Sequence, residues 1–198
     1  MGRATRRRAW SQYGGAWLLA VAVWLAGCST GAKPGGMAPS GPLVAAEVGT
    51  IDAARAAEVP TLTLRTTGGR ATNRLHTSQI SDAAFREALM AELLRSGAFR
   101  PVLDQVADYH LHVHLAEVQQ PFWGWLDMEV RIDAEWSLYE VETGRLVWER
   151  LVRSAHTATG EDSGFGIKRL RLANEGSARE NIAEGVWALE RLSLDRPR

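Results

Sequence analysis

The chain has 198 residues, no formal net charge and a 45% share of hydrophobic residues, so it is long and apolar enough to fold around one core. The charge is unevenly distributed, because residues 1–27 contain four arginines and no acidic residue. The rest of the chain holds 19 basic and 23 acidic side chains, which argues against non-specific binding of nucleic acid. The single cysteine excludes an intramolecular disulfide and a zinc site built from several thiolates.

The first 28 residues have the layout of an export signal. Met1–Arg8 is basic, and residues 16–25 form an apolar run that is too short to span a hydrocarbon core of ~30 Å as a helix. Small residues then precede the cysteine in Leu25-Ala26-Gly27-Cys28, which resembles the lipobox of bacterial lipoproteins. The resemblance implies cleavage before Cys28, a diacylglycerol thioether on its sulfur and acylation, as by palmitate, of the new amino terminus. An ordinary secretory signal and an uncleaved anchor helix are the alternatives.

The resemblance also implies a location. Two or three acyl chains hold a protein on a membrane far better than one, at roughly 0.8 kcal/mol per buried CH2 group. Ser29 follows the cysteine, where an aspartate favours retention in the inner membrane of enteric bacteria. We therefore expect a lipid-anchored protein on the periplasmic face of the outer membrane rather than of the inner membrane.

Residues 29–42 are dominated by Gly, Pro, Ser and Ala and have no apolar periodicity, so they predict a flexible tether. Residues 43–58 are rich in alanine and fit either a short helix or more linker. The expected organisation is a signal peptide over 1–27, the lipidated cysteine and tether over 28–58, and a periplasmic domain over 59–198.

The first half of this domain predicts a strand, a helix and a second strand. Residues 61–66 alternate with period two and end at Gly68-Gly69. Ser81 can cap a helix that Gly97 ends, and its apolar face comprises Phe85, Ala88, Leu89 and Leu93. A second strand alternates Tyr109, Leu111, Val113 and Leu115 with three histidines.

The second half predicts a hairpin and a long helix. Residues 128–138 alternate apolar and polar side chains, and Glu142-Thr143-Gly144 turns the chain into a strand over 146–153. A helix over about 167–192 has an apolar row of Ile167, Leu170, Ala178, Ile182, Val186, Leu189 and Leu192. Gly176 and Gly185 within it indicate close contact with the sheet, because glycine costs up to ~1 kcal/mol in a helix. The order β-α-β-β-β-α predicts an α+β two-layer sandwich, a mostly antiparallel sheet with two helices on one face.

Several segments together resemble a group of small, largely uncharacterised proteobacterial periplasmic lipoproteins. They are Ser78-Gln79-Ile80-Ser81-Asp82 with Phe85, Ala88 and Leu89, then Ala107-Asp108-Tyr109, Gln120-Pro121, Gly144, and the most specific segment, Arg169–Arg179 with Asn181-Ile182. The layout is also similar to auxiliary lipoproteins of lipid-transport ABC systems and to curli-export and TolB amino-terminal-like lipoproteins. The resemblance implies an envelope protein partner and carries over no cofactor and no residue of known chemical role.

His110, His112 and His114 form the most conspicuous polar pattern. Strand geometry places the three imidazoles on one face, with neighbouring Cβ atoms about 6.5–7 Å apart. Adjacent members could share zinc or copper if another ligand joined them. The alternative is a solvated polar face.

The connection from Gln119 to Leu126 is unusually aromatic. If Phe122, Trp123, Trp125 and Leu126 are exposed, they form an apolar tip that would dock on a partner, a lipid or a membrane interface. The alternative is that they fold back over the sheet.

Polar residues along the last helix, among them Arg169, Asn174, Glu175 and Arg179, fit either a polar groove or ordinary ion pairs and buried polar contacts. No G-x-S-x-G elbow, P-loop, dinucleotide fingerprint or H-E-x-x-H motif is present. We therefore expect no enzyme, but a non-enzymatic accessory or binding subunit of an envelope assembly or lipid-transport system. The alternative is a periplasmic lipoprotein that binds metal or a small ligand through the three histidines.

Overall fold

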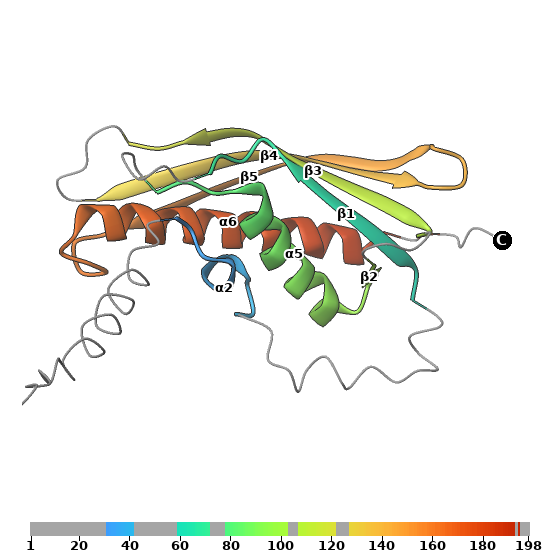
Figure 1. Cartoon of the computed structure of the whole chain (residues 1–198), viewed down its shortest axis with the longest axis horizontal. Helices are drawn as coiled ribbons and strands as arrows, with labels where there is room; N and C mark the ends of the chain where they lie inside the picture. The colour runs from blue at the N-terminus through green and yellow to red at the C-terminus, as the bar shows by residue number, and fades with distance from the viewer. Residues whose placement is uncertain are drawn as a thin grey trace, which may run out of the picture.

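The computed structural model describes residues 31–41, 59–71, 78–102, 107–121, 127–192 and 194. One sheet lies over a layer of helices in these residues (Figure 1). In chain order the elements are α2 (Pro34–Met37), β1 (Thr61–Thr67), α5 (Asp82–Ser96), β2 (Arg100–Pro101), β3 (Tyr109–Gln119), β4 (Met128–Glu140), β5 (Leu146–Ala158) and α6 (Gly166–Glu190). None of the helices in this part of the chain combines the length and hydropathy needed to cross a bilayer.

The strands lie in the order β2-β1-β3-β4-β5. β1 is parallel to β2 and β3, whereas the longer ladders β3–β4 and β4–β5 are antiparallel, so the sheet is mixed. The predicted α+β sandwich and its element order are confirmed. The two-residue strand β2 was not expected; it is held by backbone bonds from Arg100 to Pro60 and from Val102 to Leu62.

The helices α2, α5 and α6 lie on one face of the sheet, as expected for the two predicted ones (Figure 1). The alternation in β4 decides this, because its residues from Met128 to Leu138 are buried at every second position and their neighbours are more exposed. β3 follows the same rule, with Tyr109, Leu111, Val113 and Leu115 buried. The other face of the sheet is polar and carries the histidines.

The predicted ends of α5 are also confirmed. The Ser81 hydroxyl accepts a hydrogen bond from the backbone N–H of Ala84 at 3.2 Å, which satisfies one of the free donors at the start of α5. Gly97 ends that helix in the left-handed conformation, with φ of 68°.

The last helix confirms one expectation and corrects another. A Cβ atom on Gly185 would lie against the indole of Trp136, and one on Gly176 against the imidazole of His156, so both glycines permit close contact with the sheet. Ile167 was expected in the apolar row, but it is 62% exposed. It belongs to the first turn of α6, which extends beyond the buried part of the helix layer.

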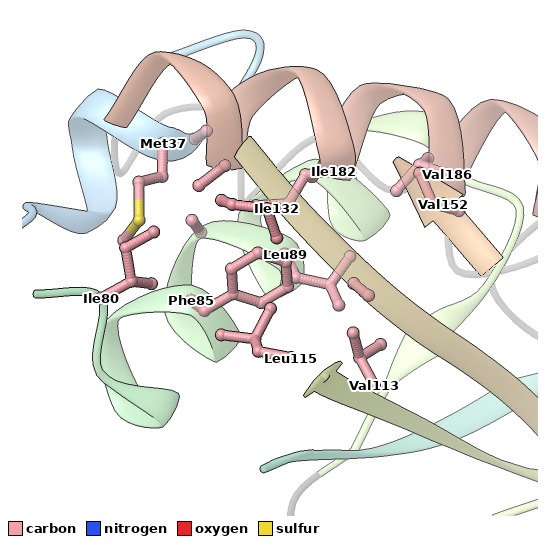
Figure 2. Close-up of a cluster of buried hydrophobic side chains, with 14 of the residues drawn as sticks. Met37, Ile80, Phe85, Leu89, Val113, Leu115, Ile132, Val152, Ile182 and Val186 are labelled. Carbon is pink, nitrogen blue, oxygen red and sulfur yellow. The ribbon is translucent and has the colours of Figure 1, made fainter. Parts of the chain in front are cut away.

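The structure departs most from the sequence prediction at residues 31–41, which do not behave as a tether. Ala32, Met37 and Ala38 are buried in the common core, and α2 contacts both α5 and α6. Figure 2 shows the Met37 side chain in the same cluster as Ile80 and Ile182. The composition argument fails because it asks whether a segment can fold alone, whereas this one packs on a surface that the domain supplies. We call residues 32–41 the N-terminal arm.

Candidate functional site

Two of the predicted sites lie outside the described residues. These are the lipidation site Cys28 and the apolar tip formed by Phe122, Trp123, Trp125 and Leu126. Their roles therefore stay predictions. The structure instead describes the histidine stripe, the surroundings of the N-terminal arm and the beginning of α6.

The three histidines lie side by side on the open face of β3, and threonines of β1 bind them. The Thr63 hydroxyl is 3.0 Å from His110 Nδ1. The Thr67 hydroxyl lies 2.8 Å from His112 Nε2 and 3.0 Å from His114 Nδ1, so it bridges the two rings. With both imidazoles neutral, Thr67 donates its proton to one ring and accepts a bond from the N–H of the other.

The surroundings favour neutral imidazoles. Partial burial, and next the positive charge of Arg65, lower the pKa of His110. Burial is also the largest cause of the lowered pKa of His112, followed by Arg65 and the two neighbouring histidines, and the nearby Glu135 opposes the shift. Both effects hold His110 and His112 toward their neutral forms.

The same contacts do not favour a metal site. Within the described ranges, no three His, Cys, Asp or Glu side chains gather closely enough to hold a metal ion. The ring centroids of His112 and His114 are 6.4 Å apart, and one ring nitrogen of each histidine lies against a threonine hydroxyl. One polar atom of each imidazole is thus satisfied without a metal ion, as on a solvated polar face.

The second feature is the seat of the N-terminal arm on α6. Glu175 is only 6% exposed, and its Oε1 accepts a hydrogen bond of 2.9 Å from the backbone N–H of Lys33. Arg171, one turn earlier, lies 3.5 Å from the same oxygen. Gly36 packs directly on the Glu175 side chain, where no Cβ atom would fit. A buried carboxylate therefore receives a backbone donor and a guanidinium, which offsets the cost of burying its charge.

Further bonds fix the arm along its length. Ala32 donates its N–H to the carbonyl of Gln79 at 3.1 Å. Arg179 Nε donates to the carbonyl of Gly36 at 3.0 Å, and Arg95 Nη1 donates to the carbonyl of Gly41 at 2.7 Å. The arm is thus bonded to the segment before α5, to α5 and to α6, and its position is determined at both ends.

A buried amide cluster lies beside this seat. Asn174 is fully buried; its Oδ1 accepts a bond of 2.8 Å from Gln120 Nε2, and its Nδ2 donates to the carbonyl of Ser78 at 3.0 Å. Gln79 Nε2 donates to Gln120 Oε1 at 3.2 Å. The cluster ties the end of β3, immediately before the predicted apolar tip, to the middle of α6.

These contacts answer the question that the sequence left open about the polar residues of α6. They bear out the second alternative, ion pairs and buried polar contacts, and most of these contacts hold the arm or the amide cluster. Most of the segment that carries the strongest family resemblance, Arg169–Arg179, is buried, in part under the arm and the amide cluster and in part against the sheet. The only local signal for the docked arm was the apolar Met37 within a Gly-rich run.

The third feature is apolar and exposed. Phe165, the N-cap of α6, is 79% exposed and Ile167 is 62% exposed. The other exposed large hydrophobic side chains among the described residues are between 41% and 48% exposed. The beginning of α6 is therefore the place where this part of the chain leaves most apolar surface in contact with water.

Ser163, Asp162 and His156, which could suggest a hydrolase, have other partners. His156 Nδ1 lies 2.9 Å from Glu180 Oε1, and Asp162 accepts the backbone N–H of Thr159 at 2.7 Å. Hydrogen bonds from Thr159, first its N–H and then its hydroxyl, lower the pKa of Asp162. These bonds hold a turn rather than align a nucleophile.

No family model matches the chain, and no curated protein matches it. Among solved structures, a protein of Xanthomonas campestris from the DUF330 family shares 16% identity at a TM-score of 0.52 and covers 66% of this chain and 84% of its own. A hypothetical protein of Chlamydia trachomatis shares 9% identity at a TM-score of 0.51, over 67% of this chain and 96% of its own. A minor lipoprotein of Acinetobacter baumannii has 10% identity and a TM-score of 0.43, over 70% and 96%. The chain therefore shares its fold with small, uncharacterised bacterial proteins, which confirms the predicted resemblance at the level of the fold.

Proposed function

We propose that the chain is a membrane-anchored periplasmic lipoprotein that serves as a non-enzymatic accessory or binding subunit of an envelope assembly or lipid-transport system. The observation that carries the proposal is the docked N-terminal arm. Only residues 29–31 separate the predicted lipid-bearing Cys28 from Ala32, whose backbone is bonded to the domain.

The docked arm sets how far the domain can move from its anchor. Four extended residues reach at most about 14 Å, since an extended chain spans ~3.3–3.6 Å per residue. A free chain over 28–58 would have an r.m.s. span of about 30 Å, at ~5–6 Å times the square root of its length. The short connection suits a subunit that works beside the membrane surface, not one that searches the periplasm.

Two surfaces remain available to a protein partner in this proposal. β5 is the last strand in the sheet order, so one of its backbone edges has no neighbouring strand among the described residues. Charged Glu149, Arg150 and Arg153 on this strand are exposed, as is common on edges that avoid self-association. The second surface is the predicted apolar tip, Phe122 to Leu126, whose base the amide cluster fixes.

Substitution of Cys28 tests the lipid anchor. We expect a Cys28→Ser variant to remain unprocessed and to lose the acyl chains, which intact-mass measurement of the membrane fraction reports directly. The wild-type chain should gain the mass of the diacylglycerol and amino-terminal acyl groups. A processed wild-type chain without that added mass would refute the proposal.

The partner surface is tested by cross-linking the lipidated protein in its own membranes and identifying the products by mass spectrometry. We expect the Trp123→Ala, Trp125→Ala double variant to lose the cross-linked partner. Trp187→Ala is the matched control, because Trp187 is a tryptophan of α6 that is 48% exposed and lies against the Arg191 guanidinium. Equal capture by the double variant and the control would remove the tip from the proposal.

Metal binding through the histidine stripe is the alternative that the sequence left open. The threonine contacts give it no support, and elemental analysis of the purified chain separates the two proposals. Stoichiometric zinc or copper that disappears in a His112→Gln variant would favour the alternative over the accessory role.

A further inference from the structure

The exposed apolar surface at the start of α6 lies at the same end of the molecule as the first described residues of the N-terminal arm (Figure 1). Phe165 is 79% exposed there, and Ile167, two positions later, is 62% exposed. The surrounding backbone is bonded, since Arg169 Nη1 donates to the carbonyl of Ser163 at 2.7 Å and Asp162 accepts the N–H of Thr159 in the preceding turn. These bonds hold the backbone that carries the two exposed side chains.

The path of the arm leads toward this surface. Lys33 is bonded to Glu175, and Gly36 is bonded to Arg179, so the arm runs along α6 in the direction of the helix. Followed backward from Lys33, the chain therefore heads toward the beginning of α6.

The remaining length of chain matches the distance. Phe165 precedes Glu175 by ten positions, which is about 15 Å along a helix that rises 1.5 Å per residue. The five residues from Lys33 back to Cys28 reach at most about 18 Å when extended. The sulfur of Cys28 can therefore reach the level of Phe165 but cannot lie far beyond it.

We propose that Phe165 and Ile167 form a membrane-contact surface, and that its occupant is the phospholipid bilayer that holds the acyl chains of Cys28. This inference rests on the proposed lipid anchor. The anchor holds the start of α6 within reach of the bilayer, and the two apolar side chains enter the interface instead of remaining in water. α6 then leads away from the membrane, and the β4–β5 turn at the other end of the sheet faces the periplasm.

The nearby charges indicate what kind of contact this is. Glu161 and Asp162 lie in the turn before Phe165, and Lys168 follows it, all of them exposed. This mixture gives anionic lipids no strong attraction, so apolar burial carries the contact. The contact should therefore form on neutral phosphatidylcholine vesicles and persist in high salt.

The test uses the lipidated full-length mature chain. Because the sulfur of Cys28 is consumed in the thioether, a second cysteine can be labelled alone with the fluorophore NBD. We place it at Phe165→Cys and, as the matched control, at Val141→Cys, which is 43% exposed at the opposite end. We expect NBD at 165 to shift to the blue on phosphatidylcholine vesicles and to be quenched by lipids with nitroxide-labelled acyl chains, and NBD at 141 to show neither effect.

The readouts separate this inference from the anchor. If the labelled chains float with the vesicles and NBD at 165 behaves like NBD at 141, the membrane contact is wrong and the anchor stands. If the chains do not float, the anchor is wrong and the contact falls with it. Replacing Phe165 could itself abolish the membrane contact that the label is meant to report. A label at Ile167→Cys, with Phe165 intact, controls for this. If the labels at both positions stay unshifted and unquenched on the vesicles, the inference is overturned.

Discussion

The docking of the N-terminal arm depends on Met37, so a Met37→Ala variant should release the arm from the domain. Met37 is fully buried, and Figure 2 shows it beside Ile80, with Ile182 in the same cluster. Truncating a buried methionine to alanine costs about 2–5 kcal/mol, the sum of lost transfer free energy and the cavity left behind. The arm has no comparable second anchor, because its other buried side chains are alanines.

This loss should fall on the arm rather than on the whole domain. A segment whose docking free energy is smaller than the global stability opens by itself. A loss of 2 kcal/mol speeds the exchange of the arm amides about 30-fold, since each 1.4 kcal/mol is a factor of ten. The melting temperature of the domain should change little, because the sheet, α5 and α6 keep their own contacts.

Hydrogen exchange read by mass spectrometry measures this directly. The reporters are the backbone N–H groups of Lys33, Gly36, Met37 and Ala38, which are all bonded in the docked arm. Lys33→Ala is the control, since its side chain is exposed and only its backbone bonds Glu175. Equal protection of the arm in Met37→Ala and wild type, or an arm already unprotected in wild type, would refute the docking argument.

Two further predictions concern the body of the domain. Gly185→Ala should lower the free energy of unfolding by about 1–3 kcal/mol through overpacking, less up to ~1 kcal/mol gained in helix propensity, because the new Cβ meets the buried Trp136 indole. Gly176→Ala should cost less in the same urea titration, because the His156 imidazole that it meets is partly exposed and can turn at the cost of its contact with Glu180. Equal losses in both variants would contradict the packing argument. The pKa values of His110 and His112 are lowered in the folded chain, so both histidines bind protons more readily in the unfolded chain. Their contribution to the free energy of unfolding should therefore be fully present above the ordinary histidine pKa of 6.5 and should be lost as the pH falls below it. Urea midpoints at about pH 7.5 and about pH 5.5 should therefore differ less in a His110→Gln, His112→Gln variant than in wild type, and an identical pH dependence would reject this origin.

The sequence determined the periodic part of the fold. Alternation in β3 and β4 and the row of Phe85, Ala88 and Leu89 in α5 depend on a local geometric repeat, so they could be recognised without knowing the partner surfaces. The cap at Ser81 and the left-handed Gly97 are local too, because each is decided by one residue and its neighbours in the chain. Of the candidate sites, the histidine stripe was predicted with its correct common face for the same reason.

Tertiary structure alone decided what long-range contacts bring together. The arm at residues 32–41 has the composition of a linker, and it is ordered only because Glu175 and Arg179, more than 130 positions later, provide its partners. Ile167 fits the apolar repeat of the last helix and is nevertheless exposed. The repeat shows which residues lie on the same face of the helix, but it does not show how far along the helix that face is covered by the sheet. Periodicity is a local property of the sequence. Burial depends on which distant part of the chain packs against a residue, and only the tertiary structure of the whole domain determines that.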